Sequence, residues 1–273
     1  MRTRQRGFVL LSIVLILLIG GGTILLTRLN SANARAAAKD GQVRDALAKI
    51  QDALVNFVSV NGYLPCPADG TLTAGLAAPA AANATCTKPD GIVPWTTLGL
   101  SAAEATDPYE NRISYRVFSG PTGLTQSGGA SMANCDSVRA PMPVPQRVGV
   151  TMAGLCRADH DTSPAQFLSG KGLILTDSGI AVSSVAYVLI SHGMNGAGAY
   201  RSTALRNAMP GATSSEYGHT QSAGPFMIKP GNTAQLAVTD PAYFDDLLTY
   251  ITISDLLSRA HVAARDWPDP LPP

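Results

Sequence analysis

Three residues in the second half of the sequence have the types that a hydrolytic enzyme uses. Ser191 and His192 are adjacent, and Asp177 precedes them. A nucleophilic hydroxyl needs a base to take its proton, and the base needs a carboxylate to orient it. However, no serine lies in the G-x-S-x-G pattern of a nucleophile elbow, and a histidine at a strand end before a glycine-rich loop is typical of a structural residue. We therefore expect a protein that is not an enzyme.

Carboxylates near the C-terminus have the chemistry of a cation site. Asp240, Asp245 and Asp246 offer the hard oxygen ligands that calcium prefers, but they lack the D-x-D-x-D-G spacing of a calcium loop. The alternative is that Asp240, which precedes Pro241, caps a helix or turn. The four histidines are too dispersed in the sequence to predict a metal site. We predict no cofactor and no metal, and calcium stays the alternative for the three aspartates.

The elements that position these residues are short strands. Residues 172–175 and 186–190 are apolar runs typical of buried strands, and the turn residues 177–179 predict that the two are neighbours in a sheet. The glycine-rich run 193–198 lacks the pattern of a phosphate-binding loop and indicates turns instead. Ser254 begins a short capped helix.

The composition excludes a nucleic-acid-binding protein and a disordered chain. The 273 residues carry 20 Lys and Arg against 19 Asp and Glu, so no basic surface is available for phosphates. Charged residues make up 14%, against about 25% in an average soluble domain. Hydrophobic residues make up 45% and the mean hydropathy is +0.12, so some apolar residues are destined for a large core or for lipid.

An apolar segment near the N-terminus predicts a membrane-spanning helix. Residues 8–27 contain no charge, and about 20 helical residues rise about 30 Å, the thickness of a bilayer core. Arg2, Arg4 and Arg6 precede the segment and favour a cytoplasmic N-terminus, which places the following residues outside the cytoplasm. The alternative is a cleaved secretory signal with a small-residue site at 32–34.

The cysteines agree with an oxidising compartment. Their number is even, and their spacing lacks the C-x-x-C pattern of zinc sites. The four residues are Cys66, Cys86, Cys135 and Cys156. We predict disulfides rather than free thiols. The sequence leaves all three connectivities open, and pairing of nearest neighbours would close two loops of about 20 residues.

A helical pattern continues beyond the apolar segment. Apolar residues recur at steps of four and three, with charged residues between them. This stripe consists of Val43, Leu47, Ile50, Leu54 and Phe57. Asn61 and Gly62 suit a helix end and Pro65 prevents the helix from resuming, so the pattern predicts one helix from near Phe8 to about Val60. Three glycines would loosen it or let a neighbouring helix approach closely. They are Gly20, Gly21 and Gly22.

The N-terminus resembles the class III signal of type IV pilins and type II secretion pseudopilins. The resemblance rests on Arg6-Gly7-Phe8 followed by the apolar run. It implies that a prepilin peptidase cleaves between Gly7 and Phe8 and methylates the new N-terminus. Major pilins carry glutamate at the fifth mature position, where this sequence has Ser12. The absence of that carboxylate favours a minor or tip subunit over a repeating one.

Separate stretches of the remaining chain are similar to pilin-like proteins. One is the LPCP sequence at 64–67, directly after the predicted helix, and another is DPYEN at 107–111. The latter resembles the pseudopilin turn that opens a strand, with Glu110 in place of glycine. Residues 190–200 and 244–248 also resemble these proteins. Some pseudopilins bind calcium in a C-terminal loop.

The residues and the resemblance together predict an α+β, pilin-like fold. It consists of a leader (1–7), a transmembrane helix half (8–29), an extracytoplasmic amphipathic helix half (30–61) and a globular domain (62–273) with an antiparallel sheet and disulfide-braced loops. The predicted function is a non-enzymatic, minor or tip subunit of a type IV pilus or secretion pseudopilus. It would be a single-pass inner-membrane protein with its globular domain in the periplasm or on the cell surface. Its expected partners are other pilin or pseudopilin subunits, prepilin peptidase and the inner membrane, without nucleic acid. The alternative is an anchored or secreted binding module that does not polymerise.

Overall fold

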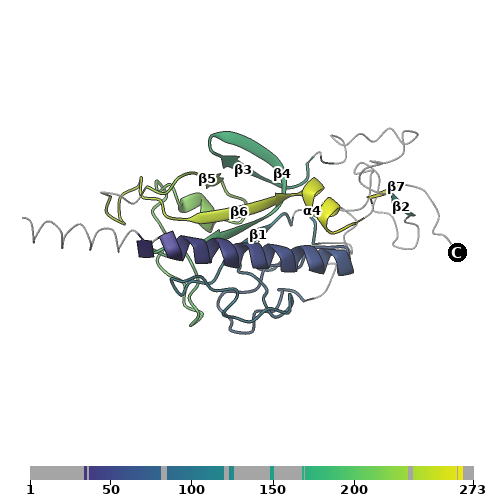
Figure 1. Ribbon diagram of the computed structural model, residues 1–273, viewed down its shortest axis with the longest axis horizontal. Helices are drawn as coiled ribbons and strands as arrows, with labels where there is room; N and C mark the ends of the chain where they lie inside the picture. The colour runs from purple at the N-terminus through teal and green to yellow at the C-terminus, as the bar shows by residue number, and fades with distance from the viewer. Residues whose placement is uncertain are drawn as a thin grey trace, which may run out of the picture. The chain divides into compact units, whose positions relative to one another are not determined.

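The computed structural model describes most of the second unit of the chain. The chain divides into two compact units, Met1–Gln42 and Val43–Pro273. The described residues are 34–35, 37–80, 85–119, 123–125, 148–150, 168, 170–232, 236–262 and 264–266. All the named strands of the described residues lie in the second unit, and Figure 1 shows the main sheet beside a helix.

The longest described helix covers residues 37–61, as the stripe of apolar residues requires. Val43, Ile50, Leu54 and Val58 are completely buried. The helix ends at Gly62, where φ is +72° and the amide donates to the carbonyl of Val58 (2.7 Å). This left-handed residue after the last turn is the usual way to close a helix, because it satisfies a carbonyl that the helix itself leaves unpaired.

The sheet has five strands built around one long strand. Its members are β1 (Ser114–Val117), β3 (Leu173–Asp177), β4 (Ile180–Ser191), β5 (Phe226–Ile228) and β6 (Leu247–Thr252). Strand β4 pairs antiparallel with β1, β3 and β6. Strand β5 pairs parallel with β3, so the sheet is not wholly antiparallel as predicted. The 3-10 helix η5 (Tyr217–Thr220) and helix α4 (Ile253–Arg259) flank β5 and β6.

A second, two-stranded sheet pairs β2 (Val148–Val150) with β7 (Ala264–Asp266) in antiparallel register.

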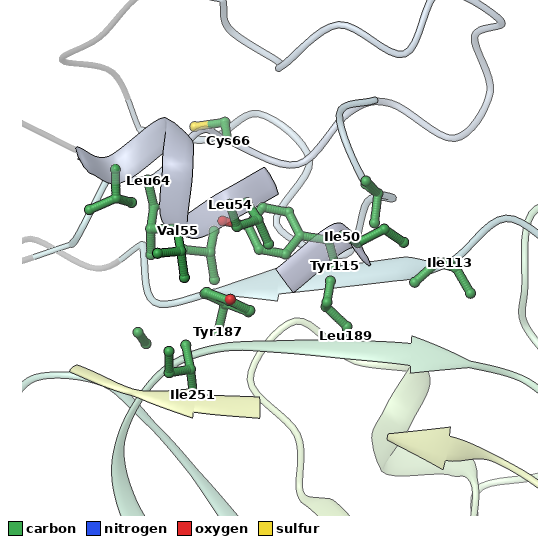
Figure 2. Close-up of a cluster of buried hydrophobic side chains, with 14 of the residues drawn as sticks. Ile50, Leu54, Val55, Leu64, Cys66, Ile113, Tyr115, Tyr187, Leu189 and Ile251 are labelled. Carbon is green, nitrogen blue, oxygen red and sulfur yellow. The ribbon is translucent and has the colours of Figure 1, made fainter. Parts of the chain in front are cut away.

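The second half of β4 is buried on both faces. Tyr187 and Leu189 belong to the core that the helix covers, together with Ile50, Leu54 and Tyr115 (Figure 2). The intervening residues of β4 point the other way, into a smaller cluster with Phe226. Alternate side chains of a strand face opposite sides of a sheet, and here both sides are covered. Ser191, the polar residue at the end of β4, therefore lies in the interior.

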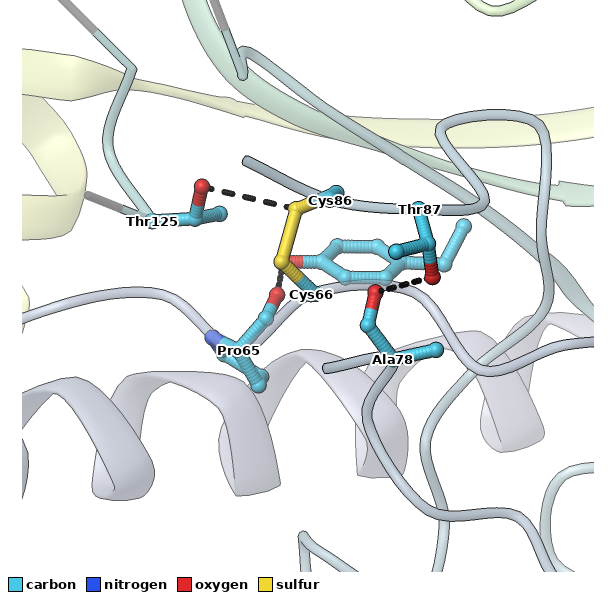
Figure 3. The surroundings of a disulfide bond; sticks show 7 residues. Pro65, Cys66, Ala78, Cys86, Thr87 and Thr125 are labelled. Atoms are coloured by element: carbon cyan, nitrogen blue, oxygen red, sulfur yellow. Dashed lines mark hydrogen bonds between the residues drawn. A yellow bond between two sulfur atoms is a disulfide. The ribbon is translucent and has the colours of Figure 1, made fainter. Parts of the chain in front are cut away.

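A disulfide joins Cys66 to Cys86, with a Cα–Cα distance of 5.3 Å (Figure 3). This is one of the nearest-neighbour pairings that the sequence left open. Both cysteines are buried, and the Thr125 hydroxyl donates to the Cys86 sulfur (3.4 Å). The Tyr115 hydroxyl donates to the carbonyl of Pro65 (3.1 Å), so the LPCP segment is fixed directly to β1.

The predicted pilin-like architecture, with a long N-terminal helix that is half transmembrane, is wrong for the described chain. No described helix is both long enough and apolar enough to cross a bilayer. The helix at 37–61 exposes Arg44, Lys49 and Asp52, and such charges are costly in hydrocarbon. The two remaining described helices of the sheet domain, η5 and α4, have four and seven residues.

The predicted localisation is corrected for the same reason. Single-pass anchoring in the inner membrane, and the description as a pilin-type membrane protein, have no support in the described helices. The predicted leader at 1–7 and spanning segment at 8–29 lie outside the described residues. So do the individual predicted residues Gly7, Phe8, Ser12, Gly20, Gly21, Gly22, Cys135 and Cys156.

Candidate functional site

The end of β4 does not carry the hydrolytic triad that residue types alone would allow. The Ser191 hydroxyl donates to Asp107 Oδ2 (2.7 Å). His192 Nε2 is hydrogen-bonded to the hydroxyl of Ser114 (2.9 Å) instead of to Ser191. Both Ser191 and His192 are completely buried, and Asp177 is the last residue of β3, where it pairs with Ile180 at the opposite end of β4. The structural interpretation of His192 is the one that this geometry favours.

The turn at 107–111 holds the end of β4 in place. Asp107 Oδ1 accepts from the amides of Tyr109 and Asn111 (both 2.9 Å), which closes the turn before β1. Glu110 adopts φ +68°, a left-handed conformation that glycine adopts more readily, and the turn forms with glutamate at this position. The Asn111 side chain donates to the carbonyl of Gly193 (3.2 Å) and so binds this turn to the loop after β4.

A buried histidine and aspartate lie beside this junction. The amide of Met227 donates to His219 Nε2 (3.1 Å), so Nε2 carries a lone pair. The proton must then be on Nδ1, which donates to Asp246 Oδ2 (2.5 Å). An imidazolium has no lone pair for Met227, and we therefore treat this pair as neutral histidine beside a carboxyl group. Burial also lowers the pKa of His219 to about 4, in agreement with a neutral imidazole.

Three carboxyl groups converge next to His219. Oxygens of Glu216, Asp245 and Asp246 all lie within 4.8 Å of one another. Glu216 Oε1 accepts from the amide of Asp245 (2.9 Å) and Oε2 accepts from the side chain of Asn195 (2.8 Å). Asp245 Oδ2 accepts from the amide of Asn195 (3.1 Å) and the hydroxyl of Tyr243 (3.0 Å). We call Glu216, Asp245 and Asp246 the carboxylate cluster.

Burial raises the pKa of every member of the carboxylate cluster. The pKa of Glu216 rises to about 7, because burial disfavours its charge and Asp246 is close. The pKa of Asp245 is raised, chiefly by burial. The pKa of Asp246 lies well above its ordinary value because of burial, with smaller effects from Asp245 and Asp107. Each group therefore resists ionisation unless a positive charge is supplied.

A buried arginine holds the segment that presents Glu216 and His219. The Arg116 guanidinium donates to three backbone carbonyls of other segments: Gly91 (2.6 Å), Gln221 (2.9 Å) and His219 (3.2 Å). Arg116 is 1% exposed, and burial lowers its pKa to about 10. These contacts with carbonyl oxygens fix η5 against β1. Among the contacts that the structure describes, no N–H of the Arg116 guanidinium donates to the carboxylate cluster.

A hollow of about 520 Å³ borders the cluster. Glu216 and Asn195 line it, together with Arg201, Met209 and Val238. Gly193 packs against another member of the cluster, because a Cβ at this position (φ +57°) would lie 2.4 Å from Asp245 Cγ. The loop after β4 thus packs directly on the carboxyl groups, as only a residue without a side chain allows.

The sequence predicted part of this cluster. Asp245 and Asp246 were candidate cation ligands and belong to it. Asp240 does not: its Oδ1 accepts from the amide of Ala242 (2.8 Å) and so caps a turn, which was the alternative. Glu216 and His219 were missed, because the stretch that contains them has no periodic pattern or motif.

Comparison of the chain with protein-family models, with curated proteins and with solved structures found no match. The resemblance to pilin-type proteins therefore stays an interpretation of the sequence motifs.

Proposed function

We propose that the chain is a non-enzymatic structural subunit that acts by binding other protein subunits, as the pilin-type motifs in its sequence imply. The observation that carries the proposal is the meeting of three motif stretches that lie far apart in the sequence. Residues 107–111 contact 190–200 through Asp107 and Ser191. Residues 190–200 contact 244–248 through the amide of Met194, which donates to Asp245 Oδ2 (2.8 Å).

The polar atoms of these motifs are mostly bonded to one another in the interior. Buried, mutually hydrogen-bonded polar groups are expected of residues that specify a fold, whereas catalytic groups must reach a substrate. Ser191, His192 and Asp246 are almost completely buried. This supports a role for the motifs in shaping a subunit rather than in turnover.

The described helix offers a surface for such binding. Its apolar stripe is covered by the sheet, and the opposite side of residues 43–61 is exposed. Lys49 and Asp52 on that side form exposed pairs with Glu104 and Arg259 of the same chain, and the buried apolar stripe holds the helix on its own domain. A rigid, exposed helix face suits docking against another subunit.

Site-specific photo-crosslinking in the source cells tests the proposal. A photoreactive residue replaces Ala48, which is exposed on the helix, and in a matched variant it replaces Ser202, which is exposed on a loop. We expect adducts from position 48 with a second copy of the chain or with another small helical subunit, identified by mass spectrometry, and none from position 202.

Recovery of the chain as a monomer without adducts from position 48 would refute assembly through this face. Adducts only from loop positions, with a ligand outside the cell, would instead identify the binding module that does not polymerise. Turnover of an ester or peptide that is lost in His192→Ala would refute the non-enzymatic role.

A further inference from the structure

In the part of the chain that the structure describes, the carboxylate cluster brings three acidic groups together without a lysine or arginine paired to them. Among the ion pairs of the described residues, none joins a lysine or arginine to Glu216, Asp245 or Asp246. The ion-pair partners of Asp246 among the described residues are His219 and His192, at 2.5 and 3.7 Å. Both are buried, and burial lowers the pKa of each imidazole, so neither contributes a positive charge.

Unsatisfied polar atoms point to the same place. Four buried side-chain atoms of the described residues have no hydrogen-bond partner, and three of them gather here: Oδ1 of Asp245, Oδ1 of Asp246 and Nδ1 of His192. The side chain of Asp246 is completely buried. A buried polar atom without a partner costs about 1–3 kcal/mol, more for a charged group, so such a concentration calls for an explanation.

The hydrogen bonds of the cluster hold its oxygens as a coordination shell would need them. Protein donors fix Oδ2 of Asp245 and Oδ2 of Asp246, and in both residues Oδ1 is left over. A carboxylate that is oriented through one oxygen and free at the other is typical of a metal ligand with outer-sphere support. Glu216 is oriented by the amide of Asp245 and by Asn195.

We propose that Glu216, Asp245 and Asp246 bind one calcium ion. The three converging ligand atoms are all carboxylate oxygens, and both nitrogens of His219 are engaged, by Asp246 and by Met227. Such a set suits a hard cation rather than zinc. Calcium accepts irregular sets of carboxylate oxygens at about 2.3–2.6 Å, whereas magnesium demands a near-octahedral set at about 2.0–2.1 Å and usually keeps several water ligands, so a buried set of protein carboxylates suits calcium better. The oxygens of the cluster lie within 4.8 Å of one another.

The ion would join two segments directly, the residue before η5 and the residues that lead into β6, and the loop after β4 supports both through Asn195. The hollow beside Glu216 and Asn195 gives it a path from solvent. This inference is independent of the proposed function, because cation binding is measured on the purified chain and assembly is measured in cells.

Calorimetry and thermal unfolding of the full-length chain test the site. After removal of cations with EGTA, CaCl2 should bind with one-to-one stoichiometry and raise the unfolding temperature, and MgCl2 should bind more weakly. Glu216→Gln and Asp245→Asn should each weaken calcium binding at least about tenfold. Asp240→Asn is the matched control: it removes a nearby carboxylate outside the cluster, keeps the turn-capping oxygen, and should respond like the wild type.

The stability of the cation-free variants separates a ligand role from a structural one. Each substitution removes one of three crowded acidic groups that are costly to ionise without a cation, so the cation-free variants should unfold at the same temperature as the cation-free wild type or above it. A second measurement needs no variant. Tb³⁺ bound in place of calcium should luminesce when tyrosine is excited, because the Tyr243 hydroxyl lies 3.0 Å from Asp245 Oδ2, and CaCl2 should abolish the signal. Absence of binding by the wild type at millimolar CaCl2, or an undiminished response of Glu216→Gln, would overturn the proposal.

Discussion

Reduction of the Cys66–Cys86 disulfide should destabilise the folded chain by about 3 kcal/mol. The bond closes a loop with a sequence separation of 20 residues. On the chain-entropy account, a loop of about 20 residues restricts the unfolded chain by about 11 cal/mol/K, which is about 3 kcal/mol at 25 °C. For a protein of this size the loss corresponds to a decrease of about 6–12 °C in the unfolding temperature.

The measurement is equilibrium unfolding in urea, with and without a reducing agent. The background is Cys135→Ala/Cys156→Ala, so that only the bond between Cys66 and Cys86 responds. We expect the reduced protein to unfold at lower urea concentration. A further variant with Cys66→Ala and Cys86→Ala should unfold identically in both conditions and serves as the control.

Two results would contradict the reasoning. Peptide mapping under non-reducing conditions could show that the peptide with Cys66 is not joined to the peptide with Cys86. Alternatively, oxidised and reduced proteins could differ by less than about 1 kcal/mol. The second result would mean that the unfolded chain is already restricted, for example by residual structure around the LPCP segment, and that the loop entropy is not released on reduction.

Three further substitutions test other parts of the fold by urea unfolding. Arg116→Met removes the donors of three buried carbonyls and should cost about 3 kcal/mol or more; a loss under about 1 kcal/mol would show that water replaces the guanidinium. Glu110→Gly relieves a left-handed residue and should stabilise by about 1 kcal/mol, and no gain would mean that the Glu110 side chain offsets the strain. The hydrogen bond from Lys49 lowers the pKa of Glu104 to about 2 from 4.5, so its stabilisation is complete above pH 4.5 and is lost as the pH falls through about 2. Glu104→Gln should therefore be less stable than wild type at pH 7 and equal to it at pH 2, and a difference that does not change with pH would exclude the charge as its cause.

Local patterns in the sequence predicted the elements that pack the core. The apolar stripe of the helix is buried as expected at Val43, Leu47, Ile50 and Leu54. At its end Val58 is completely buried, whereas the predicted Phe57 lies at the edge of the core, where its ring meets Tyr63 edge-on (5.4 Å). A period of 3.6 residues does not distinguish positions 57 and 58 at this point of the helix.

The hairpin between β3 and β4 was also predictable, because two apolar runs flank a short polar turn. Its residues pair in antiparallel register, and Ser178 takes φ +49° in the turn. Boundaries were less accurate. The N-cap of α4 is Thr252, whose side chain accepts from the amide of Asp255, and not Ser254.

The carboxylate cluster could be predicted only in part, because it depends on contacts between distant segments. Asp245 and Asp246 attract notice as adjacent acids, but acidic residues are ordinarily exposed, and nothing in the sequence marks these as buried. Glu216 enters the cluster through a 3-10 helix of four residues that has no hydrophobic period. Arg116 is distant in sequence and binds the carbonyl of His219, and this contact fixes the 3-10 helix that follows Glu216.

The two proposals meet at the end of β4, and this determines the order in which they should be tested. Variants in the motif residues change the same buried junction that holds the carboxylate cluster, so a loss of assembly could follow from a loosened fold rather than from a lost contact surface. Calcium that binds only the folded state stabilises it by mass action, by about 2.7 kcal/mol at a hundredfold excess over the dissociation constant. Crosslinking of an Asp245→Asn variant should therefore match the wild type if its domain stays folded without the ion. A defect that appears at position 48 in this variant, while its unfolding curve stays unchanged, would show that the junction contributes directly to subunit binding.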